Sequence, residues 1–213
     1  MGELDVSGGD ELAEALDRLR AGNARFLDAI ADAPDPSAAV AGLSVADPYA
    51  VVLGCSDSRV PPELVFDEAV GRLFVVRVAG NVAGNEQIGS IEYAVERWNC
   101  RAVVVLGHTQ CAAVAAAMDP PPTGAEPPPD LVGSMYLSPL LGSIRSNLGW
   151  ARSATSGDPW ADAVRGNVRR TVERLGLWSL PIRRRVDAGE LRVVGAIYHV
   201  ETGNVEFLGP EGA

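Results

Sequence analysis

The chain has 213 residues, enough for one domain with a sizeable hydrophobic core. Hydrophobic residues make up 47% and charged residues 22%, which is ordinary for a globular protein and excludes a wholly disordered chain. The formal net charge is -10 at pH 7, so a phosphate backbone gains no electrostatic attraction and we expect no nucleic-acid partner.

The first residues predict neither export nor membrane insertion. No apolar run approaches the roughly 18 residues that span a bilayer, and residues 1–10 are acidic, unlike the basic start of a signal peptide. The 3 cysteines are too few and odd in number for a disulfide framework, which favours reduced thiols or metal ligands. We therefore expect a cytoplasmic protein with no membrane partner.

The first predicted element is an amphipathic helix over about residues 8–30, interpreted as the N-terminal helical arm of a single domain that covers residues 1–213. Asp10 is expected to be its N-cap. Residues 33–48 contain three prolines and predict a loop. The apolar residues of the helix recur near helical spacing: Leu12, Leu16, Leu19, Phe26 and Leu27.

Three short apolar runs, residues 50–53, 73–78 and 102–106, are interpreted as buried parallel strands. The first and third end at glycine, and Arg77 interrupts the second. Residues 112–118 are rich in alanine and predict a helix. Another helix precedes the third strand, where apolar residues recur at Ile88, Ile91, Val95 and Trp98. The alternation predicts an α/β fold, a central, mainly parallel sheet flanked by helices.

The second half of the sequence adds a loop, a helix and a hairpin. Six of the ten residues 120–129 are proline, which predicts an exposed loop. Residues 191–200 and 205–208, separated by Gly203-Asn204, predict a closing hairpin and therefore an antiparallel edge of the sheet. A further helix is predicted by apolar residues on one face: Val164, Val168, Val172 and Leu175.

Two predicted strands end in residues that can bind a metal. The first runs into Cys55, and the third into His108 and Cys111. Ligands of open α/β sheets lie outside the carboxyl ends of strands, so we expect the two segments at one crevice if their strands are neighbours. Two thiolates and an imidazole favour zinc, and three protein ligands leave the fourth position open, as in catalytic sites. Buried core thiols and a satisfied histidine are the alternative interpretation.

Asp57 and Arg59 follow the first candidate ligand closely. A guanidinium keeps a neighbouring carboxylate ionised, so that it can accept a hydrogen bond from water on a metal. The alternative is an ordinary ion pair in a turn, which contributes about 0 to 1 kcal/mol when exposed. Cys100 is expected to be a buried apolar residue, and His199 to be a core or interface residue because it lies within the last strand pattern.

The sequence resembles the β-class carbonic anhydrases over most of its length. The resemblance is carried by C-S-D-S-R after one strand, by H-x-x-C after a later one, and by the segments F-V-V-R-x-A-G-N and G-S-I-E-Y-A-V between them. It implies that Cys55, His108 and Cys111 bind Zn2+. It also implies that Asp57 and Arg59 form a pair that orients the bound water.

The implied activity is reversible hydration of carbon dioxide to bicarbonate and a proton, by attack of zinc-bound hydroxide. The resemblance also implies an apolar substrate pocket lined by Phe74, Tyr93 and Gly107, although core aromatics would give the same pattern. Family members are dimers or multiples of dimers, which implies a homo-oligomer, either a dimer or a tetramer. The alternatives are a carbon disulfide or carbonyl sulfide hydrolase on the same scaffold, and a non-catalytic zinc-binding protein.

Two positions distinguish this chain within the family pattern. Ala46 stands where many members have a glutamine whose amide contacts substrate, so either this donor is missing or Gln110 or a backbone group replaces it. Val52 stands where the bicarbonate-inhibited subtype has tryptophan, which favours the subtype with an open site. Two thiolates cancel the charge of Zn2+, so hydroxide is attracted less strongly than by a three-imidazole site. We therefore expect activity to rise toward alkaline pH.

Overall fold

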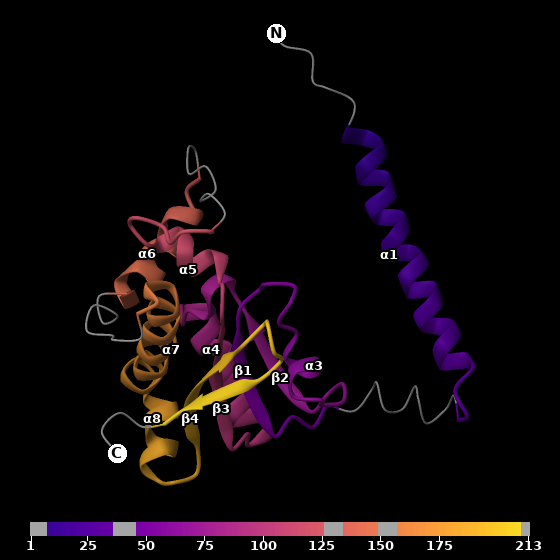
Figure 1. Cartoon of the computed structure of the whole chain (residues 1–213). Coiled ribbons are helices and arrows are strands. Elements are labelled where there is room, and N and C mark those ends of the chain that lie inside the picture. The colour runs from indigo at the N-terminus through magenta and orange to yellow at the C-terminus, as the bar shows by residue number, and fades with distance from the viewer. Residues whose placement is uncertain (1–7, 36–45, 126–133, 149–156, 210–213) are drawn as a thin grey trace. The chain divides into compact units, whose positions relative to one another are not determined.

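The computed structural model describes residues 8–35, 46–125, 134–148 and 157–209 (Figure 1). The chain divides into two compact units, Met1–Val45 and Ala46–Ala213. The first unit contains α1 (Gly8–Ala31), as the periodicity predicts. The helix begins before Asp10, so this residue lies in its first turn and is not the N-cap. Three apolar side chains of α1 are exposed: Leu19, Phe26 and Leu27.

The second unit is built on a five-stranded sheet with the strand order β2-β1-β3-β4-β5. The strands are β1 (Ala50–Gly54), β2 (Leu73–Arg77), β3 (Ala102–His108), β4 (Arg192–Tyr198) and β5 (Val205–Leu208). The pairs β2–β1, β1–β3 and β3–β4 are parallel, and β5 pairs with β4 in the antiparallel direction. The predicted fold class, including its antiparallel edge, is confirmed.

Helices flank this sheet (Figure 1). They are α3 (Pro62–Val65), the 3-10 turn η1 (Ala79–Asn81), α4 (Asn85–Trp98), α5 (Ala112–Ala117), α6 (Leu137–Leu148), α7 (Pro159–Trp178) and α8 (Leu180–Asp187). Helix α4 packs on β1 and β2, whereas α7 packs on β3 and β4 and also contacts α5 and α6. Among the helices that the structure describes, none is long and apolar enough to cross a membrane.

Both faces of the central strands are buried. On one face, Val51 and Leu53 of β1 join the core beneath the helices. On the other, Val52 packs with Val104 and Leu106 of β3. Burial on both sides is the reason why these strands read as continuous apolar runs instead of alternating ones.

The order of the strands reverses between β1 and β3, and ligands of open α/β sheets bind beside such a reversal. Gly54, the last residue of β1, pairs with Leu106, so β3 continues for two residues beyond it. The residues that follow β1 and the end of β3 therefore meet at one edge of the sheet. Of the predicted loops, residues 33–35, 46–48 and 120–125 have no helix or strand, and the remaining parts lie outside the described residues.

Candidate metal centre

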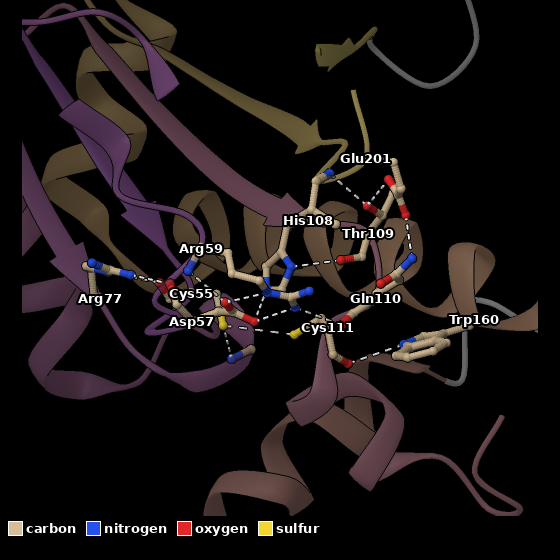
Figure 2. A network of polar contacts seen from close by, with 12 residues as sticks. Cys55, Asp57, Arg59, Arg77, His108, Thr109, Gln110, Cys111, Trp160 and Glu201 are labelled. Atoms are coloured by element: carbon tan, nitrogen blue, oxygen red, sulfur yellow. Dashed lines mark hydrogen bonds and ion pairs between the residues drawn. The ribbon is translucent and has the colours of Figure 1, made fainter. Parts of the chain in front are cut away.

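The carboxyl ends of β1 and β3 bring Cys55, His108 and Cys111 together (Figure 2). Cys55 directly follows β1, His108 ends β3, and Cys111 is the N-cap of α5. Their side chains are 3%, 0% and 1% exposed, and their two sulfurs and imidazole nitrogen all lie within 4.8 Å of one another. The three predicted ligands therefore form one buried cluster, drawn from two strand ends and a helix start.

The cluster fits a zinc ion in both spacing and chemistry. Two zinc–sulfur bonds of about 2.3 Å at a tetrahedral angle separate the sulfurs by about 3.8 Å, and the Sγ atoms of Cys55 and Cys111 lie 3.9 Å apart. His108 donates from Nδ1 to the carbonyl of Thr109 at 2.9 Å, so its Nε2 is left as an acceptor. In the part of the chain that the structure describes, this buried Nε2 has no hydrogen-bond partner, as expected of a metal ligand.

The two thiols differ in acidity. A hydrogen bond from Cys111 lowers the pKa of Cys55 to about 4, and the neighbouring imidazole of His108 and the backbone N–H of Gly80 act in the same direction. The hydrogen bond with Cys55, burial and the neighbouring charge raise the pKa of Cys111. Cys55 is therefore the more acidic of the two thiols, and Cys111 is the one that keeps its proton. A divalent cation would take the place of this proton, because metal ligation favours both thiolates.

Asp57 and Arg59 form a bidentate ion pair at the edge of this cluster (Figure 2). Arg59 donates from Nε to Oδ1 at 3.0 Å and from Nη2 to Oδ2 at 2.7 Å, and its backbone N–H adds a bond of 2.9 Å to Oδ1. These bonds hold the pKa of Asp57 at about 2. Oδ2 of Asp57 lies 3.8 Å from Nε2 of His108, so the ionised carboxylate borders the place where a metal on that nitrogen would lie.

Arg77 holds the loop after β1, a supporting role that no sequence pattern predicted. It donates from Nε to the carbonyl of Cys55 at 2.9 Å and from Nη2 to the carbonyl of Asp57 at 2.6 Å. It therefore fixes the backbone beneath both a candidate ligand and the candidate orienting carboxylate. The only local signal was a charged residue within an otherwise apolar strand.

A buried polar chain supports the sulfur of Cys55 from the other side. Gly80 donates its N–H to this sulfur at 3.3 Å, and its carbonyl accepts from Nδ2 of Asn167 at 2.7 Å. Asn147 donates in turn to Oδ1 of Asn167 at 2.8 Å. Gly80 has a φ of 71°, and a Cβ there would lie 2.6 Å from Cδ1 of Ile144, so the position requires glycine.

The loop between His108 and Cys111 is tied to the turn after β4. Thr109 Oγ1 and Gln110 Nε2 both donate to the carboxylate of Glu201, at 2.8 and 2.6 Å. Gln110 is one candidate to replace the glutamine that many family members have at the position of Ala46. Its amide nitrogen, however, donates to Glu201. Sequence patterns gave no signal for Glu201, which lies far along the chain.

The three residues predicted to line a substrate pocket occupy two places. Phe74 on β2 and Tyr93 on α4 have ring centroids 6.5 Å apart, and both contact Trp98. Gly107 lies in β3 against α7, where a Cβ would be 2.4 Å from Cγ2 of Val168. Their role in substrate binding stays a prediction.

The remaining cysteine and histidine lie outside the cluster. Cys100 is buried and donates its thiol to the carbonyl of Pro48 at 3.2 Å, as expected for a core thiol. His199 is 34% exposed, with Nε2 at 3.6 Å from Glu206, which in turn accepts two bonds from Arg165. It therefore lies in a partly exposed polar network, and the expectation that it belongs to the core is wrong.

A family model described as carbonic anhydrase matches residues 50–205 of the chain. A carbonic anhydrase of Mycolicibacterium smegmatis is 39% identical over 195 residues, which cover 89% of each chain. Carbonic anhydrase 2 of Mycobacterium tuberculosis is 38% identical over 193 residues and 87% of each chain.

Solved structures agree with the sequence relatives. A Coccomyxa β-carbonic anhydrase in complex with acetazolamide has a TM-score of 0.63 at 26% identity, over 97% of this chain and 87% of that chain. A β-carbonic anhydrase of Sordaria macrospora, described as tetrameric, has a TM-score of 0.68 at 22% identity, over 94% of this chain and 98% of that chain. At this lower identity the second similarity concerns the fold.

Proposed function

The chain belongs to the β-carbonic anhydrase family, whose members are enzymes that hydrate carbon dioxide, and from this premise we propose that it does so with Zn2+ held by Cys55, His108 and Cys111. The observation that carries the proposal is the buried cluster of two sulfurs and an imidazole nitrogen within 4.8 Å of one another. When bound, zinc supplies Lewis acidity, which lowers the pKa of water so that it reacts as a nucleophile.

Asp57 orients water in this proposal and does not take up its proton. A carboxylate with a pKa of about 2 is ionised throughout the neutral range, and it is too weak a base to hold a proton there. It can still accept a hydrogen bond, which fixes the direction of the oxygen lone pair toward carbon dioxide. Arg59 balances the negative charge of Asp57 and fixes its two oxygens. The proton then leaves to solvent or buffer.

The substrate pocket in this proposal is apolar, as suits a linear, uncharged molecule, and it is lined by Phe74, Tyr93 and Gly107. We also propose a homo-oligomer, dimer or tetramer, in which a second copy would cover Tyr93, which is 58% exposed in the single chain. We place the enzyme in the cytoplasm, where free thiols such as those of this chain stay reduced.

The proposal is tested by measuring zinc content and carbon dioxide hydration on the same samples. Cys111→Ser and His108→Ala each remove a ligand and should lose most of the zinc and of the activity, measured by elemental analysis and stopped-flow. Cys100→Ser is the matched control, since it replaces a buried thiol outside the cluster and should keep both. Activity without stoichiometric zinc in the unmodified chain would overturn the mechanism, and parallel assays on carbonyl sulfide and carbon disulfide define the substrate.

A further inference from the structure

Glu201 lies in the turn after β4 and reaches back to the loop between two of the metal-binding residues (Figure 2). Its Oε2 accepts from Thr109 Oγ1 at 2.8 Å, and its Oε1 accepts from Gln110 Nε2 at 2.6 Å. Thr109 and Gln110 are the whole spacer between His108 and Cys111. One carboxylate, more than ninety residues further along the chain, therefore contacts both residues of this spacer.

The backbone of Gln110 needs such a contact. Its φ is 55°, in the left-handed region, which costs a residue with a side chain roughly 1 to 2 kcal/mol. Gln110 is the residue directly before Cys111, so its backbone angles set the direction in which the chain turns into α5. A change of Gln110 toward ordinary angles would move the sulfur of Cys111 away from the other two ligand atoms.

The turn that carries Glu201 is itself fixed to the same loop. Thr109 donates its N–H to the carbonyl of Tyr198 at 2.9 Å, and its Oγ1 accepts from the N–H of Val200 at 3.0 Å. The pKa of the Glu201 carboxyl is lowered, chiefly by a hydrogen bond from its own backbone and then by Thr109, so it is ionised at neutral pH. Its bonds to Thr109 and Gln110 are therefore charge-assisted.

Gln110 also connects this loop to the residues that orient water. Its carbonyl lies 3.4 Å from Nη2 of Arg59, the nitrogen that also donates to Oδ2 of Asp57. A displaced Gln110 would consequently withdraw one partner of Arg59 as well as move Cys111. The contact is long, so the effect on the ligand sulfur is the larger of the two.

We propose that Glu201 is a positioning residue of the metal centre, which acts by holding Gln110 in its left-handed conformation and thereby the sulfur of Cys111 in ligand geometry. This inference rests on the proposed function, because it concerns the same three ligands. The hydrogen bonds that the structure gives the Glu201 carboxylate go to Thr109 and Gln110, which lie between the candidate ligands, so it acts through this spacer.

The test compares zinc-loaded wild type with Glu201→Ala and Glu201→Gln. Partners in the outer shell of a metal site typically change affinity or activity by about 10- to 100-fold, so Glu201→Ala should release zinc to an excess of a colorimetric chelator at least about 10-fold faster. Glu201→Gln keeps an acceptor for Thr109 but presents an amide nitrogen to Gln110, and it should lie between the two. In Co2+-substituted protein, the thiolate-to-cobalt absorption band should shift in Glu201→Ala.

Two further variants separate this role from a general loss of stability. Glu96→Ala is the matched control, because Glu96 is also exposed and bonded, here to Arg185, but it lies on α4 before the start of β3. It should release zinc at the wild-type rate. Gln110→Gly removes the backbone penalty, since glycine adopts this φ freely. In that background the substitution of Glu201 by alanine should add less than about 2-fold to the release rate.

Each outcome bears on a definite step. Zinc-loaded wild type and Glu201→Ala with equal release rates and equal cobalt spectra would overturn this inference alone. Equal acceleration by Glu201→Ala with and without Gln110→Gly would also overturn it, because the effect would not pass through Gln110. A wild-type chain without stoichiometric zinc would overturn the proposed function itself, and this inference with it.

Discussion

Asp57→Asn removes the negative charge of the proposed orienting residue and keeps its shape. Asparagine keeps one acceptor oxygen, but its amide nitrogen would face the guanidinium of Arg59, so one of the two side-chain bonds, 3.0 and 2.7 Å long, is replaced by a contact between donors. Zinc ligation does not involve this residue in our proposal. We therefore expect a variant that holds zinc and turns over poorly.

The size of the effect follows from the pKa of Asp57. A decrease from 3.8 to about 2 corresponds to about 2.5 kcal/mol in favour of the ionised carboxylate. Asp57 is 17% exposed, but Arg59 is 48% exposed and regains water when its partner is lost. The expected loss in the free energy of unfolding is therefore smaller, about 1 to 2 kcal/mol. This contribution is present above pH 3.8 and disappears as the pH falls through about 2, so the stabilities of the variant and wild type should approach each other between these two pH values.

Stopped-flow hydration of carbon dioxide between about pH 6 and 9, with zinc measured on each sample, tests the role in catalysis. The loss of a group that orients the reacting atoms typically costs about 100-fold, and we expect kcat/KM to fall by about this factor. Asp47→Asn is the control, because it breaks an exposed ion pair with Arg72 of the same length, 2.7 Å. It should leave kcat/KM unchanged. A zinc-loaded Asp57→Asn variant with wild-type kcat/KM at every pH would refute the reasoning.

Two other predictions follow from the donor set and from the packing of β3. Activity should rise toward alkaline pH, because two thiolates cancel the charge of a divalent ion and so attract hydroxide less strongly. Asp57, with a pKa of about 2, does not titrate in that range. A pH profile of activity that is flat down to about pH 6 would contradict this prediction. Gly107→Ala should lower the free energy of unfolding, measured in urea, by about 1 to 3 kcal/mol, because the new Cβ would lie 2.4 Å from Cγ2 of Val168. A variant as stable as the wild type would show that α7 moves aside freely.

The sheet and the meeting of the three candidate ligands could be predicted because both depend on local patterns. The central strands are buried on both faces, and continuous apolar runs are the signature of such strands. The carboxyl ends of neighbouring parallel strands meet at one edge, so Cys55 and His108 could be placed together before the structure was known. The end of β3 was predicted too early, at the glycine after residue 106. The strand continues through Gly107 to His108 because both pair with β4, and Gly107 allows α7 to approach closely.

The residues that support the cluster could not be predicted, because each acts over a long distance in the sequence. Arg77 is 22 residues from its partner Cys55, Asn167 is 87 residues from Gly80, and Glu201 is 91 residues from Gln110. No periodicity or spacing connects such pairs. Their hydrogen bonds exist only once the strands and helices have packed.

The asparagine pair beneath Cys55 makes the metal centre dependent on the interior of the helical layer. Asn147 comes from α6 and Asn167 from α7, and both side chains are buried away from water. The hydrogen bond between them therefore depends on the distance between these two helices. Substitutions that widen this spacing would weaken the N–H of Gly80 as a donor to the ligand sulfur, without touching any ligand. Redesign of this protein for heat resistance should therefore leave both amides in place, because an all-apolar interior would remove the support of a sulfur that we propose to bind the metal.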